Sequence, residues 1–203
     1  CKGIISITNN NWSSILTFTF GDVYLIQGNG QYSATMTGAF VADDGHLQDY
    51  IRDAACTSLD LTAVTELPAS LGWTETNRII YLPESSATVG NNLVVAGVCS
   101  SLVLSPVGGD FRPAKPFTAS QATFTCKVEG CRLLMLPFAA GVPEGVKAYS
   151  VSSDRVVTPV ETIAAHQPVL IEAEGEVTFT GSGEVSYAVS PLADFLRGSY
   201  TQR

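Results

Sequence analysis

The sequence predicts a mainly β protein with a minor helical part, in which an N-terminal unit carrying one helix precedes an antiparallel β-sandwich. Two observations lead to this prediction. Short runs of alternating apolar and polar residues recur along most of the 203 residues, and Gly, Asn, Asp and Pro separate them. The alternation gives way only once to apolar residues at helical spacing.

The first 37 residues contain four such runs, which are Ile4–Thr8, Ile15–Phe20, Val23–Gln27 and Tyr32–Thr37. Runs of period two bounded by turn-forming residues predict β-strands. Gly28–Gly30 favours a hairpin turn between the last two runs.

The helix is predicted directly after these strands. Asp43 or Asp44 can cap its first turn, because a short side-chain oxygen accepts hydrogen bonds from the free amides there. Apolar residues then recur at helical spacing at Leu47, Tyr50, Ile51, Ala54 and Ala55. We expect the helix to end near Cys56.

Short strands then recur at steps close to the period of a leucine-rich repeat, about 20–29 residues. They are Ala34–Thr37, Ser58–Leu61 and Arg78–Leu82, and two more follow at Leu93–Val95 and Leu102–Leu104. The spacing of Leu59, Leu61 and Val64 resembles one turn of such a repeat. We therefore predict a short leucine-rich-repeat-like coil of parallel strands over residues 31–105, with the helix on its outer face and flanking β structure as caps.

Residues 106–116 are rich in Pro and Gly and form the predicted linker, so that the chain divides into residues 1–110 and 111–203. Beyond the linker, turn residues recur about every 8–12 positions, which is typical of a sandwich. The predicted strands are Ala122–Val128, Arg132–Leu136, Ala148–Ser152, Val156–Val160, Val169–Ala173, Val177–Thr180 and Val185–Val189. We expect hairpin turns at Lys127–Gly130 and Glu172–Glu176.

The charge pattern narrows the class of partner. The net charge is −8, and charged residues make up 15% of the chain, against ~25% in a typical domain. Lys and Arg form no run, which argues against nucleic acid and against an anionic membrane surface as partners. No stretch approaches the ~20 apolar residues of a membrane span. A surface this poor in charge is common in secreted β proteins, so we predict an extracytoplasmic location.

Five cysteines are present, and this odd number argues against a full disulfide framework. Cys56 and Cys99 lie in apolar surroundings and are predicted to be core residues. Cys126 and Cys131 flank a predicted hairpin turn and are the candidate disulfide. Cys1 has two readings, which the sequence leaves open. It is either the lipid-bearing first residue of a mature bacterial lipoprotein, the one link to a membrane that we expect, or the point where processing left the chain.

The sequence predicts no catalytic residue, no metal site and no cofactor. The histidines, His46 and His166, have no metal-ligand spacing to a cysteine. His46 is predicted to be solvated in the first turn of the helix, and His166 to be a loop residue before a strand. No Gly-x-Ser-x-Gly motif or phosphate-binding glycine loop is present. An unrecognised hydrolase therefore stays as the less favoured alternative.

Trp12 and Trp73 are the candidate ligand-binding residues. Sugar rings stack on exposed aromatic rings that have polar neighbours, and Trp12 follows the asparagines 9–11. The competing interpretation of each tryptophan is a core or cap residue, since tryptophan is highly buried on average.

Several short motifs, taken in their order, resemble the terminal repeats and the C-terminal β module of leucine-rich-repeat surface proteins from Bacteroidetes-type gut and oral bacteria. The repeat motifs are Thr57–Leu61, Ile79–Glu84, Val95–Cys99 and Leu102–Leu104. The module motifs are Lys115–Ala119, Leu136–Phe138, Gln167–Ile171, Thr178–Gly181 and Leu196–Tyr200. The resemblance covers roughly residues 31–203.

The resemblance implies a non-enzymatic module of a cell-surface or secreted protein that serves adhesion or ligand binding, or is an accessory part of a surface assembly. It carries over no catalytic residue. Host glycans or surface proteins are the expected partners, and self-association through a strand edge is a further alternative. The sequence departs from the family pattern at His166 and Gln167, where a small polar residue is usual. It also ends at Arg203, where the module usually continues.

Overall fold

The computed structural model describes residues 32–39, 56–67, 77–107, 111–152, 154–187, 191–192 and 196–197. Every regular element within these ranges is a β-strand, which confirms the prediction of a mainly β fold. The helix predicted between Asp43 and Cys56 lies outside the described residues, except that Cys56 itself begins a strand. The three strands predicted before Tyr32 also lie outside them.

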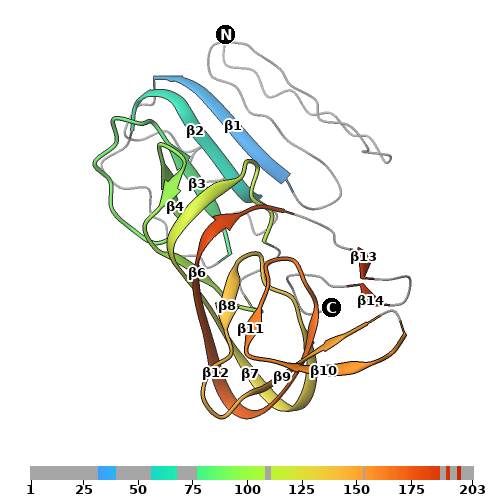
Figure 1. The fold of residues 1–203 in the computed structure, drawn as a ribbon. Coiled ribbons are helices and arrows are strands. Elements are labelled where there is room, and N and C mark those ends of the chain that lie inside the picture. Colours follow the sequence, from blue (N-terminus) through green and yellow to red (C-terminus); the bar gives the residue numbers. More distant parts are fainter. Residues whose placement is uncertain are drawn as a thin grey trace.

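Four parallel strands begin the described chain: β1 (Tyr32–Ala39), β2 (Cys56–Glu66), β3 (Ile79–Leu82) and β4 (Leu93–Val95). Strands β2, β3 and β4 each pair in parallel with the strand before them, and Figure 1 shows the four side by side in chain order. The strands lie where the sequence predicted them. The strand–helix alternation of a leucine-rich repeat is not seen in the described residues, since residues 83–92, between β3 and β4, form turns and irregular chain.

Strand β3 shows why this part of the sequence forms parallel strands. Its four side chains, Ile79 to Leu82, are all buried. A strand covered on both faces has a continuous apolar run instead of an alternating one. Ile79 and Tyr81 face the main apolar core, and Ile80 faces the opposite side of the sheet.

The sheet changes direction after β4. Ala96 and Gly97 both have positive φ, 49° and 77°, as the tightest hairpin turns require. They return the chain into β5 (Val98–Cys99), which is antiparallel to β4. Strands β5 and β6 (Leu102–Leu104) then both pair in parallel with β7. Strands on both sides of the predicted linker therefore belong to the same hydrogen-bonded sheet.

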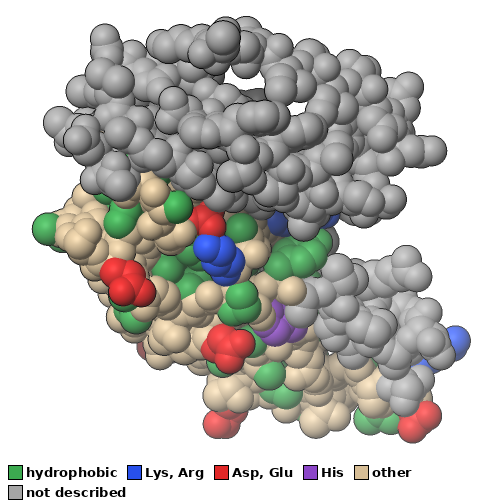
Figure 2. Space-filling model, turned by 90° about the horizontal axis from the view of Figure 1, so that it is seen from above, with side chains coloured by type: hydrophobic (Ala, Val, Ile, Leu, Met, Phe, Trp, Pro, Cys, Tyr) green, Lys and Arg blue, Asp and Glu red, His purple; other side chains and the backbone are tan. Residues whose placement is uncertain are grey.

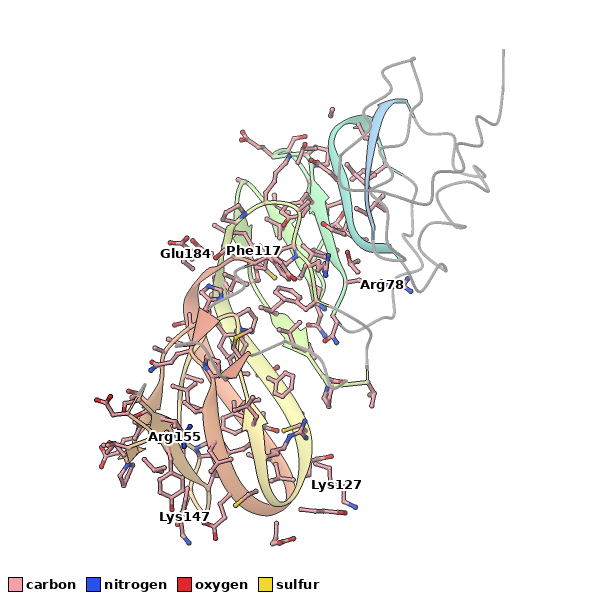
Figure 3. The ribbon with its side chains drawn as sticks, turned by 90° about the vertical axis from the view of Figure 1, so that its right-hand side faces the viewer. Arg78, Phe117, Lys127, Lys147, Arg155 and Glu184 are labelled. Atoms are coloured by element: carbon pink, nitrogen blue, oxygen red, sulfur yellow. The ribbon has the colours of Figure 1, made fainter. Side chains whose placement is uncertain are left out.

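The two longest strands, β7 (Phe117–Leu134) and β12 (Val169–Val185), pair in antiparallel fashion along their whole lengths. A straight strand of this length would span about 55 Å. Figure 1 instead shows both strands curling together. In Figure 3, Phe117 and Glu184 mark one end of this ribbon, and Lys127, which pairs with Glu176, lies near its bend.

The hairpin turns predicted at Lys127–Gly130 and Glu172–Glu176 are wrong, because both segments lie inside these strands. Gly130 and Gly175 do have positive φ, 78° and 100°. They lie close together across the ladder, since Gly130 pairs with Ala173 and Gly175 with Val128. Both strands bend at the same place, so the residues that suggested turns produce a bend without ending the pairing.

The remaining strands attach to the ends of β12. Strand β9 (Lys147–Val151) pairs with its beginning and β8 (Ala139–Gly141) with its end. Strand β10 (Val157–Val160) pairs with β9, and β11 (Thr162–Ile163) with β8. A separate short ladder joins β13 (Pro191–Leu192) and β14 (Leu196–Arg197).

The described C-terminal strands do not form the separate two-sheet sandwich that the sequence predicted. Strands β1 to β12 belong to one mixed twelve-stranded sheet. Because β7 and β12 curl, their inward side chains enclose a core within this single sheet. Its largest fully buried aromatic side chains are Phe111, Phe138 and Phe179. Alternating side chains can fill the inside of a curled sheet as well as the space between two sheets, and the sequence pattern is the same for both.

A substitution at Gly181 tests how closely β8 packs against β12. A Cβ added there would overlap the carbonyl oxygen of Ala139 and would lie 2.9 Å from the Phe138 ring. We expect Gly181→Ala to lower the free energy of unfolding by at least about 1–3 kcal/mol, because the backbone of β8 would have to move. Gly141→Ala is the matched control, since nothing lies within 4 Å of its added Cβ. Equal denaturant midpoints for the two variants would contradict the close approach of β8 to β12.

Candidate functional site

The three candidate residues Cys1, Trp12 and Trp73 lie outside the described residues. Cys126 and Cys131 are described, and both are free thiols. The hairpin that was to bring them together is a continuous part of β7, with Cys126 buried and Cys131 exposed. Burial raises the pKa of the Cys126 thiol, although the charge of Arg132 opposes this. The predicted disulfide is therefore not formed in this structure.

The most developed group of polar side chains lies where residues 111–116 cross strands β2 and β3. We call Ser58, Asp60, Tyr81 and Lys115 the crossing cluster. Asp60 and Tyr81 are cross-strand partners in the β2–β3 ladder. The hydroxyl of Ser58 accepts a hydrogen bond from the amide of Ala114, with an N···O distance of 3.2 Å. Parallel pairing thus aligns side chains from two strands beneath one segment.

Asp60 is the charged centre of the crossing cluster. It is only 5% exposed, and its carboxylate forms an ion pair with the ammonium group of Lys115. The amide and the hydroxyl of Thr62 also donate to it, at 3.0 and 2.6 Å. Burial alone would raise the pKa of Asp60, but the hydrogen bonds from Lys115 and Thr62 and the Lys115 charge outweigh it and hold the pKa below its usual value.

The hydroxyl of Tyr81 forms hydrogen bonds with the backbone of the same segment, residues 111–116. It donates to the carbonyl oxygen of Lys115 at 2.5 Å and accepts from the Lys115 amide at 3.0 Å. Its ring packs edge-on against Phe117, with centroids 6.3 Å apart. Burial is the largest cause that raises the pKa of Tyr81 above its usual value, so the hydroxyl keeps its proton at neutral pH.

These pKa shifts decide what the crossing cluster can do. A general acid or base works best when its pKa lies near the operating pH. The pKa of Asp60 is lowered and that of Tyr81 is raised, so both move away from neutrality. Each group is also bonded to the segment that it holds. The crossing cluster is arranged to fasten residues 111–116 to the parallel strands.

A second polar contact joins the two ends of β12. The Nε2 atom of His166, just before β12, lies 3.2 Å from the hydroxyl of Ser186, just after it. The amide of His166 also donates to the carbonyl oxygen of Leu136 at 2.7 Å. His166 adopts a positive φ of 62°. This contact shows how far the strand curls, because a straight β12 would hold its ends far apart.

The His166–Ser186 pair has the reach of a base and a nucleophile. Burial lowers the pKa of His166, with the charge of Glu184 acting against it, so the neutral imidazole is favoured. A hydrolase also needs donors aimed at the oxyanion that forms during acyl transfer. What the geometry shows directly is a contact that closes the curl of β12.

The described surface offers little else for chemistry. Its described residues contain no group of three or more His, Cys, Asp or Glu side chains placed to hold a metal ion. No helix among them is long and apolar enough to cross a membrane. On the face shown in Figure 2, acidic and basic side chains are scattered among apolar and uncharged ones.

The chain was compared with models of protein families, with curated proteins and with solved structures, and none of the three comparisons gave a match. Its function is therefore argued from its own residues.

The crossing cluster gives a direct stability test. Tyr81→Phe leaves the amide and the carbonyl of Lys115 without their partner, and we expect a loss of about 1–3 kcal/mol of unfolding free energy. Tyr149→Phe, in the half-buried part of β9, is the matched control. Chemical denaturation followed by fluorescence measures both. A loss of the same size in both variants would mean that the Tyr81 hydroxyl contributes nothing specific.

His166 predicts a pH dependence. Its pKa is lower in the folded chain than the usual 6.5, so the unfolded chain takes up this proton more readily. The stability it contributes is complete above pH 6.5 and is lost as the pH falls through the folded pKa. We expect the melting temperature of the wild type to fall more between pH 7.5 and 5.0 than that of His166→Gln. Identical pH profiles would show that His166 titrates normally.

Proposed function

We propose that this chain is a non-enzymatic module of a secreted or cell-surface bacterial protein, used for adhesion or ligand binding or as an accessory part of a surface assembly. The observation that carries the proposal is the succession β1, β2, β3, β4. These strands follow one another in the sequence and are parallel neighbours in the sheet. Stacked single-strand units of this kind are typical of repeat proteins, whose extended surfaces bind partners.

The positions of the module motifs also support the proposal. Leu136–Phe138 and Thr178–Gly181 are far apart in the sequence, yet Gly181 packs against Phe138 and Ala139. The amide of His166, next to Gln167–Ile171, bonds to Leu136. These three motifs therefore meet where the ribbon closes.

The chemistry of the polar groups agrees with a role without catalysis. The carboxylate of Asp60 and the hydroxyl of Tyr81 hold the backbone and the side chain of one crossing segment. Strongly shifted pKa values mark active sites in many enzymes, but structural ion pairs shift them as well. Here the partners of both groups lie within the fold.

A binding array tests the proposal. The purified chain would be applied to host glycans, mucins and matrix proteins, together with the variants Trp12→Ala and Trp73→Ala. We expect saturable binding by the wild type. Loss of binding in either tryptophan variant, with an unchanged melting temperature, would make the chain a glycan-recognition module and locate its site. Absence of binding to every surface would overturn the adhesion role and leave a part in a larger assembly.

The non-enzymatic part of the proposal has its own test. A fluorophosphonate probe labels an activated serine that has a histidine base. We expect no labelling above that of the Ser186→Ala variant. Labelling of the wild type that disappears in Ser186→Ala and in His166→Gln would replace this proposal with a hydrolase.

A further inference from the structure

The side chains of two asparagines form hydrogen bonds with the backbone along one edge of strand β6, where a neighbouring strand would otherwise pair. Asn92 donates from its side-chain amide to the carbonyl of Val103 at 3.0 Å, and its side-chain oxygen accepts from the Val103 amide at 2.6 Å. Asn77 forms the same pair of bonds with Ser105, at 2.5 and 2.7 Å. The backbone amide of Asn92 donates to Ser101. Residues 101, 103 and 105 are the alternate positions that a neighbouring strand would use.

The local conformation of these asparagines explains how they reach β6. Both have positive φ, 68° for Asn77 and 60° for Asn92, a region that asparagine tolerates better than most residues. Each comes just before a parallel strand, β3 or β4. A side-chain amide carries one acceptor and two donors, so it can match both groups of one peptide edge. The starts of β3 and β4 thus close an edge whose other side bonds to β7.

Strand β10 is a second edge strand, because among the described strands it pairs only with β9. Bonded and non-bonded pairs alternate in an antiparallel ladder. The Ser152 amide donates to the Val156 carbonyl at 3.0 Å, so this pair is a bonded one. The next pair along the ladder, Val151 with Val157, is then non-bonded, and the alternation makes Tyr149 with Pro159 non-bonded as well. Val157 and Pro159 consequently turn their backbone groups outward. Pro159 has no amide hydrogen, so the exposed side of β10 lacks a donor at that position.

We infer that β6 and β10 are closed to strand addition, β6 by the amides of Asn77 and Asn92 and β10 by Pro159. A partner therefore meets these parts of the chain through side chains and not by extending the sheet. This inference rests on the edges alone and goes beyond the proposed function. It also argues against the self-pairing alternative at β10, since a second copy of the chain is the strand that an open β10 would capture. Val157, already half-exposed at 53%, would supply apolar contact.

Restoring the missing donor tests the β10 half of the inference. We expect the wild-type chain to sediment as a monomer across a hundredfold range of concentration. Pro159→Thr should raise the weight-average mass with concentration toward that of a dimer. The double variant Val157→Pro/Pro159→Thr moves the proline to the other outward position and should return the chain to a monomer. A monomeric Pro159→Thr chain, or a wild type that already dimerises through β10, would overturn the role of Pro159.

Hydrogen exchange in the wild type and in one variant tests the β6 half of the inference. We expect the amides of Val103 and Ser105 to exchange slowly and the outward amide of Val157 to exchange fast. Asn92→Gly keeps the positive φ but removes the side-chain amide, so it should accelerate exchange at Val103 while leaving Phe179 in the core unchanged. Fast exchange at Val103 in the wild type would overturn the closure of β6. These readouts do not depend on whether the chain binds any surface in the array.

Discussion

The pairing of β7 with β12 is the contact on which the rest of the main sheet depends. Strands β5 and β6 bond to β7, and strands β8 and β9 bond to β12. Strands β4, β10 and β11 join through those neighbours. Because the two long strands bend together at Gly130 and Gly175, the ribbon curls until His166 and Ser186 come into contact. The bend that the two strands share, together with the register shift between Gly181 and Gly183, brings the ends of β12 and the strands attached to them close together.

Two polar fastenings join the parallel strands to this ribbon. The crossing cluster holds residues 111–116 against β2 and β3, and Asn77 and Asn92 hold β6. All these bonds satisfy backbone groups or a carboxylate that would be unfavourable to bury alone. The Arg112 guanidinium, 5.1 Å from the centre of the Tyr187 ring, also links this segment to the end of β12. Polar side chains therefore connect the parallel strands to the antiparallel β7–β12 ribbon.

This use of polar residues bears on function. Asp60 and Tyr81 have the shifted pKa values that often mark catalytic groups. Burial explains the raised pKa of Tyr81, and the contacts with Lys115 and Thr62 explain the lowered pKa of Asp60. If β6 and β10 are closed to strand addition as inferred, these parts of the sheet present their side chains to a partner, which suits a binding or accessory module. The comparisons add no relative to this argument. The proposal therefore depends on strand order, on the contacts between the module motifs and on the binding experiment.

Alternation and apolar runs in the sequence predicted the β class and the positions of β2, β3, β4 and β6, because each strand must match the burial of its two faces. The sequence also marked Gly130 and Gly175 as special positions. It did not reveal that they bend paired strands, because a glycine allows a turn or a bend equally well until its partner strand is known. The crossing cluster and the paired asparagines were likewise missed. Asn77 and Asn92 each precede an apolar strand, which was the available signal, but their partners lie up to 28 residues away. Local pattern determines which residues form strands, whereas contacts between distant residues decide how those strands join, and only the tertiary structure contains them.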